Sequence, residues 1–490
     1  MESEAKGATL VTRGSTVDRQ NRRVHDQEAS SRRLSAIARV SGLTVGTAGV
    51  LLGLTAISAP LPAAAETVII PAPPGLSDPG VRAGAGATTS PIVGLTEGQK
   101  AFYNAGLEDF VHADGVSEGL GPRFNLDSCA ICHSFPAVGG SSPQTNPEIS
   151  IPARFAGNTL PPFIPANGAG PIVEARFRND NAVHPLFVIS GATDGSTAGC
   201  NIQQEDFATQ IANNNISYRI PTPVFGEGLL EEITDTTLTN NLAASSSQKA
   251  ALGIVGHLNH NPNDGTVTRF GWKAQNKSML VFAGEAYNVE IGISNEMFTQ
   301  ERDETASCQF FTKPNDFFDT AATTPAEALS GIEKFAFFMR FLAPPPPSSS
   351  LPGGSTSINN GKAAFNTVGC ALCHTPTLTT GNATVTALAN KPVNLYSDLA
   401  LHAMGPNLAD RIVQGQARGD EFRTAPLWGL GQRTYFLHDG RTADLFTAIQ
   451  LHKSLASGAT TASEANAVVD AYNNLSIQSR QDVLNFLRSL

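Results

Sequence analysis

The sequence contains two copies of one five-residue pattern, Cys129-Ala-Ile-Cys132-His133 and Cys370-Ala-Leu-Cys373-His374. Two thiols one helical turn apart can form thioethers with the vinyl groups of one porphyrin, and the histidine that follows then lies beneath the iron. A zinc site would need paired cysteines that converge without obligatory histidines, and a thioredoxin-like pair would need a βαβ setting. The pattern therefore predicts two covalently bound c-type haems, with His133 and His374 as the proximal iron ligands.

Each copy of the pattern follows a predicted helix. Thr96-Glu97-Gly98-Gln99 predicts a capped helix start about 30 residues before the first copy, and the segment 360–365 runs directly into the second. Apolar faces at 325–342 and 478–490 predict two further helices that pack across these first helices. Each half is therefore expected to form a cytochrome c-like unit.

A stretch rich in Pro, Ser and Gly separates the two halves. Four consecutive prolines from Pro344 are followed by three serines and by Pro352-Gly353-Gly354, a composition typical of a linker. The predicted parts of the chain are an irregular lead at 66–93, a first haem domain at 94–342, a linker at 343–355 and a second haem domain at 356–490.

The first 65 residues have the features of an export signal. Several arginines, up to Arg39, precede an uncharged stretch at 40–65 that ends in Ala63-Ala64-Ala65, a small-residue cleavage pattern. We expect cleavage near Ala65 and an exported, in bacteria periplasmic, protein without a membrane anchor. A retained anchor is the alternative, because the uncharged stretch is long enough to span a bilayer. Ser31-Arg32-Arg33 leaves twin-arginine export open as the route.

The chain carries a net charge of −10, and its predicted mature part is more acidic still. Residues 1–65 hold 8 basic and 5 acidic residues, which leaves 25 basic and 38 acidic residues in the remainder. A mature protein this acidic has no electrostatic attraction to phosphate backbones or anionic membranes. We therefore expect no nucleic-acid partner.

The two halves also share a second repeat. Arg219-Ile-Pro-Thr-Pro-Val-Phe-Gly-Glu-Gly228 in the first half parallels Arg423-Thr-Ala-Pro-Leu-Trp-Gly-Leu-Gly431 in the second. Over 78–490 the chain resembles the diheme oxidoreductase family, sometimes labelled thiol oxidoreductases, in the superfamily of bacterial diheme cytochrome c peroxidases, MauG and diheme rubber oxygenases. The resemblance rests on the haem motifs and on Asp78-Pro-Gly-Val-Arg82, Gly119-Leu-Gly-Pro-Arg-Phe124, Pro136-Ala-Val-Gly-Gly-Ser-Ser-Pro143, Arg269-Phe-Gly-Trp-Lys-Ala-Gln275, Leu427-Trp-Gly-Leu-Gly431 and His438-Asp-Gly-Arg441. It implies a mostly α fold of two cytochrome c-like haem domains with long irregular loops.

The resemblance also implies a division of labour. In the superfamily the first haem is the reactive, catalytic one, and the second passes electrons past a tryptophan whose position Trp272 matches. A glutamate above the reactive haem follows that tryptophan in the sequence, and Glu290, eighteen residues after Trp272, fits best. Such a carboxyl can move a proton between the oxygens of a peroxide if a poorly hydrated pocket raises its pKa. Glu285 and Glu231 are the competing carboxylates.

The second haem needs a sixth iron ligand. In the related peroxidases a methionine follows the histidine of the His-Asp-Gly turn by fourteen residues, and the same count from His438 leads to His452. A histidine here would give this haem a lower potential, because imidazole stabilises ferric iron relative to a thioether. The resemblance to the rubber oxygenases, with two histidines on this haem, points the same way. Met404 is the competing ligand.

Two features of the peroxidases have no counterpart in the sequence. Their calcium site uses a Thr-x-Pro segment just before the His-Asp-Gly turn, where this chain has Arg433-Thr434-Tyr435. A calcium site is therefore possible, but the sequence does not support one. They also carry a second histidine shortly after the first haem motif, whereas no histidine occurs here between His133 and His184. We therefore expect an open, five-coordinate first haem.

Two cysteines lie outside the haem motifs, Cys200 and Cys308. In an oxidising compartment, two cysteines that remain outside other motifs most simply form a disulfide. A redox-active thiol pair would need adjacency or neighbours that stabilise a thiolate, and the sequence shows neither. We expect a structural disulfide within the first domain.

The sequence thus predicts an exported diheme c-type oxidoreductase that reduces hydrogen peroxide at the first haem. Its electrons would come from a small redox donor protein of the cytochrome c or cupredoxin type. Two alternatives stay open. One is oxidative modification or oxygenation of an organic or protein substrate, and the other is an electron carrier without catalysis, for which two six-coordinate haems would suffice.

Haem loading tests the two motifs directly. The purified mature protein should carry two covalently bound haems, and a Cys129→Ala/Cys132→Ala variant should carry one, because the remaining thiols serve only the second site. Pyridine haemochrome absorbance per protein, together with mass spectrometry, measures the number. Two haems in the variant would reject the assignment of the first motif.

Overall fold

The computed structural model of the chain describes residues 68–83, 86–348 and 351–490. All of them belong to one unit, Ala59–Leu490. The predicted export signal at 1–65 lies outside the described residues, as do positions 349–350 of the predicted linker. Within the part of the chain that the structure describes, no helix combines the length and the apolar composition needed to cross a membrane.

The described residues form fourteen α-helices, most of them short. They are α1 (Glu97–Val111), α2 (Cys129–Cys132), α3 (Ile151–Arg154), α4 (Phe207–Ala212), α5 (Glu227–Glu231), α6 (Asp235–Ala243), α7 (Ser246–Ala251), α8 (Met279–Ala286), α9 (Pro325–Ala328), α10 (Gly331–Phe341), α11 (Gly354–Val368), α12 (Leu445–Leu451), α13 (Asn466–Asn473) and α14 (Ile477–Ser489). Short 3₁₀ turns lie at Val116–Glu118, Pro147–Ser150, Ala306–Cys308, Cys370–Leu372 and Leu430–Gln432. A π-helical turn, Tyr287–Ile291, directly continues α8.

Ten short strands pair in five antiparallel two-stranded sheets in the described chain. The pairs are β1 (Arg123–Phe124) with β3 (Phe187–Val188), β2 (Glu174–Phe177) with β4 (Ile216–Arg219), β5 (Asn259–His260) with β6 (Val267–Thr268), β7 (Leu378–Thr379) with β8 (Pro392–Val393), and β9 (Leu401–Ala403) with β10 (Glu421–Arg423). Helix is more abundant than strand, but loops and turns make up more than half of the described residues. The long irregular loops are therefore present, whereas "mostly α" overstates the helix content.

Helix α1 begins where the sequence predicts. The Thr96 hydroxyl accepts a hydrogen bond from the Gln99 backbone at 3.2 Å, and the Gln99 side chain accepts one from the Thr96 backbone at 2.9 Å. This capping box satisfies two backbone N–H groups that the helix itself leaves free. The helix then packs on α10, where Phe102 stacks on Phe337 with 4.8 Å between ring centroids.

The predicted helix at 325–342 consists of two helices, α9 and α10. Thr324 caps α9 in a capping box with Glu327, and Ser330 caps α10 in a second capping box with Glu333. Each box fixes a helix start, so the chain must leave the first helix before it begins the second. The prediction of one continuous helix was wrong here.

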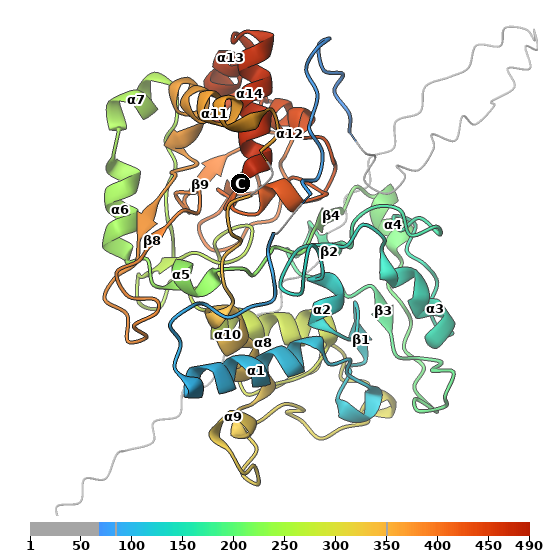
Figure 1. Ribbon diagram of the computed structural model, residues 1–490. Helices are drawn as coiled ribbons and strands as arrows, with labels where there is room; N and C mark the ends of the chain where they lie inside the picture. The colour runs from blue at the N-terminus through green and yellow to red at the C-terminus, as the bar shows by residue number, and fades with distance from the viewer. Residues whose placement is uncertain (1–67, 84–85, 349–350) are drawn as a thin grey trace, which may run out of the picture. The chain divides into compact units, whose positions relative to one another are not determined.

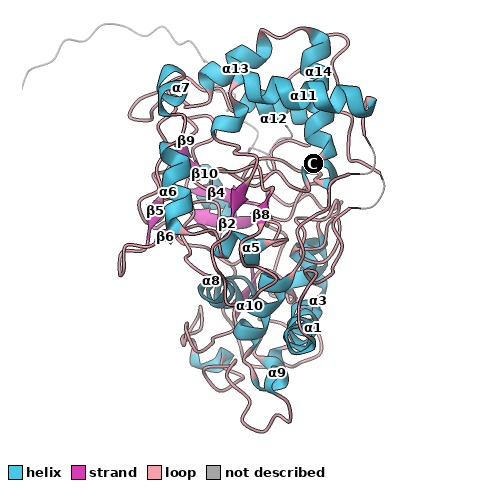
Figure 2. Ribbon diagram, turned by 60° about the vertical axis from the view of Figure 1, so that its left-hand side comes forward, coloured by secondary structure: helices cyan, strands magenta, loops and turns pink. Residues whose placement is uncertain are grey.

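The second half repeats the helix crossing with α11 and α14. Ser357 of α11 donates a hydrogen bond to Asp482 of α14 at 2.5 Å, and Phe365 meets Phe486 edge-on with 5.5 Å between ring centroids. Figures 1 and 2 show α11, α13 and α14 together at one end of the unit and α1 with α10 at the other. Each predicted pairing of a first and a last helix is therefore present.

A glycine stands at each crossing. A Cβ atom at Gly106 of α1 would lie 2.1 Å from the Lys334 carbonyl oxygen of α10. A Cβ atom at Gly361 of α11 would lie 1.9 Å from the Asp482 carbonyl oxygen of α14. Neither distance leaves room for a side chain, so the close approach of the helices depends on glycine. The same arrangement at both crossings agrees with the internal repeat of the sequence.

The irregular lead before α1 contacts both halves. Asp78 pairs with Arg488 of α14 at 2.6 Å, with 9% and 1% of their side chains exposed. Further along, the backbone of Ile92 donates to the Phe341 carbonyl of α10 at 2.7 Å. The lead thus bonds to the last helix of each half.

The largest cluster of buried apolar side chains draws on both predicted domains. It includes Phe110 and Phe338 from the first and Leu395, Leu399 and Trp428 from the second. Because one cluster spans 94–342 and 356–490, the two halves share part of their core.

Substitution of Gly106 tests the first helix crossing. Gly106→Ala should lower the free energy of unfolding by about 1–3 kcal/mol, the usual cost of overpacking, because α1 and α10 must move apart. Gly98→Ala on the same helix is the matched control, since a Cβ there meets open space and alanine favours helix. Denaturant unfolding followed by circular dichroism compares the two variants. Equal midpoints would contradict the tight crossing.

Candidate functional site

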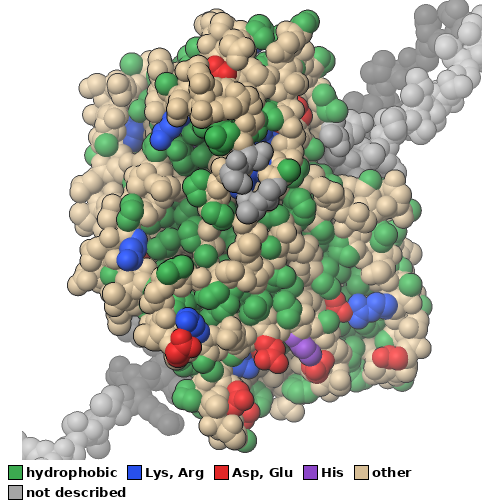
Figure 3. Space-filling model, in the orientation of Figure 1, with side chains coloured by type: hydrophobic (Ala, Val, Ile, Leu, Met, Phe, Trp, Pro, Cys, Tyr) green, Lys and Arg blue, Asp and Glu red, His purple; other side chains and the backbone are tan. Residues whose placement is uncertain are grey.

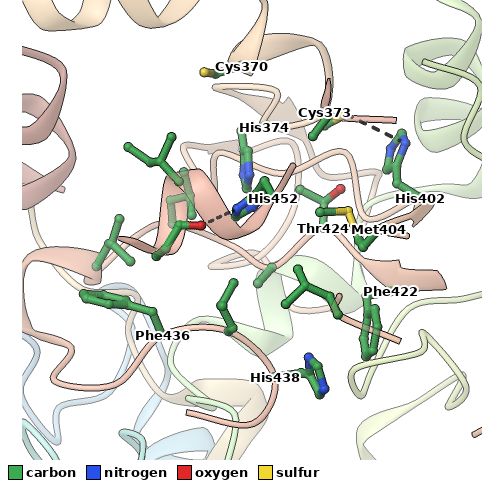
Figure 4. Close-up of a pocket in the computed structure, with 18 of the residues that line it drawn as sticks. Cys370, Cys373, His374, His402, Met404, Phe422, Thr424, Phe436, His438 and His452 are labelled. Carbon is green, nitrogen blue, oxygen red and sulfur yellow. Dashed lines mark hydrogen bonds between the residues drawn. The ribbon is translucent and has the colours of Figure 1, made fainter. Parts of the chain in front are cut away.

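A cavity of about 240 Å³ with mainly apolar walls lies beside the second Cys-x-x-Cys-His motif. Cys370, Cys373 and His374 line it, together with His452 from the end of α12 and Met404 from the turn after β9. Figure 4 shows the rings of His374 and His452 next to each other within it. The structure therefore brings together the predicted attachment cysteines, the predicted proximal histidine and both candidates for the sixth ligand.

His374 and His452 present the same ring nitrogen to the cavity. Nδ1 of His374 faces the Tyr396 carbonyl at 3.1 Å, and Nδ1 of His452 faces the Ala448 carbonyl at 2.7 Å. A histidine whose Nδ1 hydrogen is held by a carbonyl keeps Nε2 available as a ligand atom. Burial, with the neighbouring His452, lowers the pKa of His374 to about 4, and burial lowers the pKa of His452 as well. Both rings are thus neutral, the form that binds a metal.

Met404 occupies a different part of the cavity wall. Its backbone N–H donates to the Asp420 carbonyl at 2.8 Å, which ties it to the strand pair β9–β10. In Figure 4 its sulfur lies beside Thr424, whereas His452 lies beside His374. This placement favours His452 over Met404 as the partner of His374.

His402, which the sequence did not single out, lies beside Cys373. Its Nε2 faces Asp398 at 3.0 Å and its Nδ1 faces Glu464 at 2.8 Å, with 4% of the side chain exposed. Burial opposes a charge on the ring, but Cys373 and Asp398 outweigh it and raise the pKa of His402 well above its usual value. Cys373, Asp398 and His402 are close enough to hold a metal ion, yet carboxylates on both ring nitrogens indicate an imidazolium held by ion pairs.

A second cavity, of about 90 Å³, lies beside the first Cys-x-x-Cys-His motif. Cys129, Cys132 and His133 line it. Nδ1 of His133 faces the Gly140 carbonyl at 3.1 Å, and burial lowers the pKa of His133 to about 4. His133 therefore matches His374 in its hydrogen bond and in its neutral charge. All four motif cysteines are free thiols.

Glu290 lies in this first cavity, on the π-helical turn Tyr287–Ile291. Turns of this kind inside a helix occur often at functional sites. Burial raises the pKa of the Glu290 carboxyl to about 8, and the nearby Glu174 and Glu285 add to the shift. The carboxyl can therefore take up and release a proton near neutral pH.

The two competing carboxylates are engaged with other partners. Glu231 pairs with Arg340 at 2.7 Å and accepts a hydrogen bond from the Met279 backbone at 3.0 Å. Glu285 accepts one from the Asn276 side chain at 2.5 Å. The arrangement favours Glu290 as the acid–base group of the first cavity.

Trp272 lines both cavities. Its indole N–H donates to the Ile220 carbonyl at 3.0 Å, and Ile220 also lines both. His438, which the sequence analysis used as part of a family motif but did not assign to the site, meets the indole edge-on with 6.4 Å between centroids. His438 in turn stacks on Phe422 at 4.3 Å. An aromatic path therefore leads from the wall of the first cavity into the second.

Buried arginines line both cavities. Arg219 in the first, and Arg423 and Arg433 in the second, each have an Nε atom without a hydrogen-bond partner among the described residues. Burial lowers the pKa of Arg433 to about 10. A buried guanidinium is stabilised by an anion. Arg219 already pairs with the buried Asp410 at 2.7 Å, and for Arg423 and Arg433 the propionate carboxylates of a haem would supply the anion. The free thiols, the neutral histidines and these arginines together fit a haem in each cavity.

The second sequence repeat explains where two of these arginines lie. Arg219 ends β4 and Arg423 ends β10. Gly226 and Gly429 follow them with φ angles of 70° and 71°, and each begins a helical turn. Each half thus places an arginine at its cavity and then reverses the chain at a left-handed glycine. The sequence repeat contained this signal, but its function as part of the cavity wall was missed.

Cys200 and Cys308 form a disulfide, which confirms that prediction. Both residues are buried. The bond joins segments 108 positions apart within the first half and leaves the motif thiols unpaired.

A family model described as "Di-haem oxidoreductase, putative peroxidase" matches residues 179–490. The chain belongs to this di-haem oxidoreductase family. The resemblance drawn from the sequence motifs is thereby confirmed. The match includes the second haem motif, Trp272, Glu290 and His452, and it begins after the first haem motif.

Two solved structures share weak similarity with this di-haem oxidoreductase. Hydrazine synthase from Kuenenia stuttgartiensis is 16% identical, with 34% of this chain and 56% of that chain covered and a TM-score of 0.21. A MauG-like protein associated with microbial copper homeostasis is 18% identical, with 55% of this chain and 89% of that chain covered and a TM-score of 0.27. The match thus spans little more than half of the hydrazine synthase chain. No curated protein sequence matches the chain.

Substitution of His452 tests the sixth ligand of the second haem. In His452→Ala, one low-spin haem should become high-spin or gain a weaker ligand, and its reduction potential should change, because an imidazole is lost from the iron. Absorption and electron paramagnetic resonance spectra of the holoprotein, with a redox titration, measure both effects. Met404→Ala is the control and should leave the spectrum unchanged. The reverse pattern would assign the ligand to Met404.

Proposed function

We propose that this di-haem oxidoreductase carries two covalently attached c-type haems and reduces hydrogen peroxide at the first. The proposal depends mainly on Glu290, a carboxyl with a raised pKa in the same cavity as the first haem motif. When bound, the haem supplies the iron at which the oxygen–oxygen bond of peroxide can be broken. The family description, "Di-haem oxidoreductase, putative peroxidase", supports the same reaction.

Glu290 serves as the acid–base group in this proposal. Its carboxylate takes a proton from one peroxide oxygen and returns it to the other, which leaves as water. Arg176 and Glu174, which also line the cavity, pair with each other at 2.5 Å, so their charges are largely balanced. An electron carrier without catalysis would have no use for a buried carboxyl of this kind.

The second cavity serves electron transfer in this proposal. His374 and His452 would be the protein ligands of the second haem iron, and with both ligands in place this iron would bind no peroxide. Trp272, in the wall common to both cavities, is the relay between the two haems, and His438 extends the aromatic contact on the side of the second haem. The first cavity is then the reactive one, because its motif histidine has no such partner in the sequence up to His184.

Export of the mature chain and a small redox donor protein of the cytochrome c or cupredoxin type complete the proposal. The predicted export signal at 1–65 supports the first, and the excess of acidic residues after it supports a donor with a basic face. Figure 3 shows acidic side chains gathered at the end of the unit that carries α1 and α9. The same first cavity would also serve the alternative, oxidation of an organic or protein substrate.

Substitution of Glu290 tests the acid–base step. Glu290→Gln keeps the size of the side chain but removes the base, so peroxide turnover should fall by about 10²–10⁴-fold with both haem spectra retained. Because burial raises the pKa of Glu290 to about 8, the carboxyl is neutral below that pH and ionised above it. The wild-type rate should therefore rise as the pH passes through about 8, and this dependence should vanish in the variant.

Stopped-flow mixing with peroxide measures the rate and its pH profile. Glu285→Gln, a carboxamide on the adjacent α8, is the matched control and should react within a few-fold of the wild type. Trp272→Phe should affect a later step. The reaction of peroxide at the first haem should keep its wild-type rate, whereas electron transfer from the second haem to the first should be slower. A wild-type rate in Glu290→Gln would transfer the acid–base role to another group.

A further inference from the structure

Tyr287 is a buried tyrosine on the same π-helical turn as Glu290, and the mechanism above makes no use of it. Its side chain points away from solvent, with 8% of the residue exposed. The hydroxyl donates a hydrogen bond to Oδ1 of Asp114 at 3.2 Å. A buried phenol whose hydrogen is already held by a carboxylate can lose an electron and that proton together.

Aromatic contacts connect Tyr287 to the first haem motif. Its ring meets Phe335 edge-on with 4.9 Å between centroids. Phe335 meets Phe110 at 6.2 Å, and Phe110 meets His133 at 6.0 Å. In addition to burial, the Asp114 charge helps to raise the pKa of the Cys129 thiol, and the Cys129 charge helps to raise the pKa of Tyr287, so both groups lie near the site where the first haem would be attached.

Asp114 lies in the loop after α1 and is partly exposed to solvent. His112 and Glu118, which also act on the Asp114 carboxyl together with Asp109, are half exposed and pair with each other at 3.1 Å. Burial raises the pKa of Asp114 to about 7, although the bond from Tyr287 opposes the shift. The carboxyl can therefore hold an additional proton near neutral pH without leaving its place.

We propose that Tyr287 and Asp114 form a redox-active pair that donates one electron to the first haem site during the reduction of hydrogen peroxide. Reduction of one hydrogen peroxide to two waters takes two electrons and two protons. Tyr287 supplies one electron as its O–H bond breaks and becomes a neutral tyrosyl radical, while the phenolic proton moves along the hydrogen bond to Asp114. The other electron comes from the haem centres, and the two protons that complete the two waters come from the solvent. This inference rests on the proposed peroxide reduction.

Tyr103 provides a matched control within the same core. It is 2% exposed, and its ring packs against Phe338 with 5.5 Å between centroids. In the described part of the chain its hydroxyl has no hydrogen-bond partner. Burial raises the pKa of Tyr103 to about 12, and a proton leaving this phenol would have no acceptor. Reaction with peroxide should therefore oxidise Tyr287, whose hydroxyl is bonded to a carboxylate, and should not oxidise Tyr103.

Freeze-quench electron paramagnetic resonance of the holoprotein after mixing with hydrogen peroxide tests the pair. A tyrosyl radical should appear in the wild type and in Tyr103→Phe and should be lost in Tyr287→Phe. Asp114→Asn should lower its yield several-fold, because the amide cannot accept the proton. Ring-deuterated tyrosine in the unsubstituted protein should narrow the signal, which identifies the radical without any change of sequence.

The outcomes separate this inference from the function on which it rests. Absorbance changes of the haem on mixing with peroxide, recorded in the same samples, report the reaction at the iron. A haem that reacts without a tyrosyl radical, or with one that persists in Tyr287→Phe, would overturn the inference and leave peroxide reduction intact. A haem that does not react with peroxide would overturn both.

Discussion

Ile220 accepts the indole hydrogen of Trp272, and this bond fixes the wall that both cavities share. The second half holds the same wall by its backbone. Arg423 donates its N–H to the Trp272 carbonyl at 2.9 Å, and Ile220 donates to the His438 carbonyl at 2.8 Å. Because two backbone bonds and the indole bond converge here, neither half can shift without displacing the tryptophan. The relative position of the two cavities is therefore set by these buried bonds to the main chain rather than by contacts at the surface.

The two halves use one scaffold and differ in the chemistry of their walls. Each has crossing helices with a glycine at the contact, a motif histidine bonded to a carbonyl, and a strand that ends in a buried arginine. The first cavity adds carboxyl groups, whose ionisation burial makes costly. The second adds His402, His438 and His452, and most of its remaining wall is apolar. A repeated frame thus supports one cavity that contains buried carboxyl groups and another whose wall is more apolar.

The features that the sequence predicted are those that depend on near neighbours. The capping box at Thr96 and the Cys-x-x-Cys-His motifs involve residues within four positions of each other, so their pattern is visible without a fold. Trp272 and Glu290 were found only through family resemblance, because many tryptophans and glutamates have no such role. Arg433, His402 and the bond from Tyr287 to Asp114 could not be predicted, since the chain brings them to their partners from distant positions. The break between α9 and α10 was missed although its two capping boxes are local.

The ion pair between Asp78 and Arg488 joins residues 410 positions apart. A ribosome releases the chain from its N-terminus, so the lead must wait for α14 before this pair can close. Contacts of such long range are slow to form, because chain entropy must be lost before they contribute. Until then the second half lacks the arginine that its core encloses, and the wall of the second cavity lacks Val483 and Leu487 of α14. The order of synthesis thus leaves the second cavity accessible longest, which is the interval in which a prosthetic group could be delivered to Cys370 and Cys373.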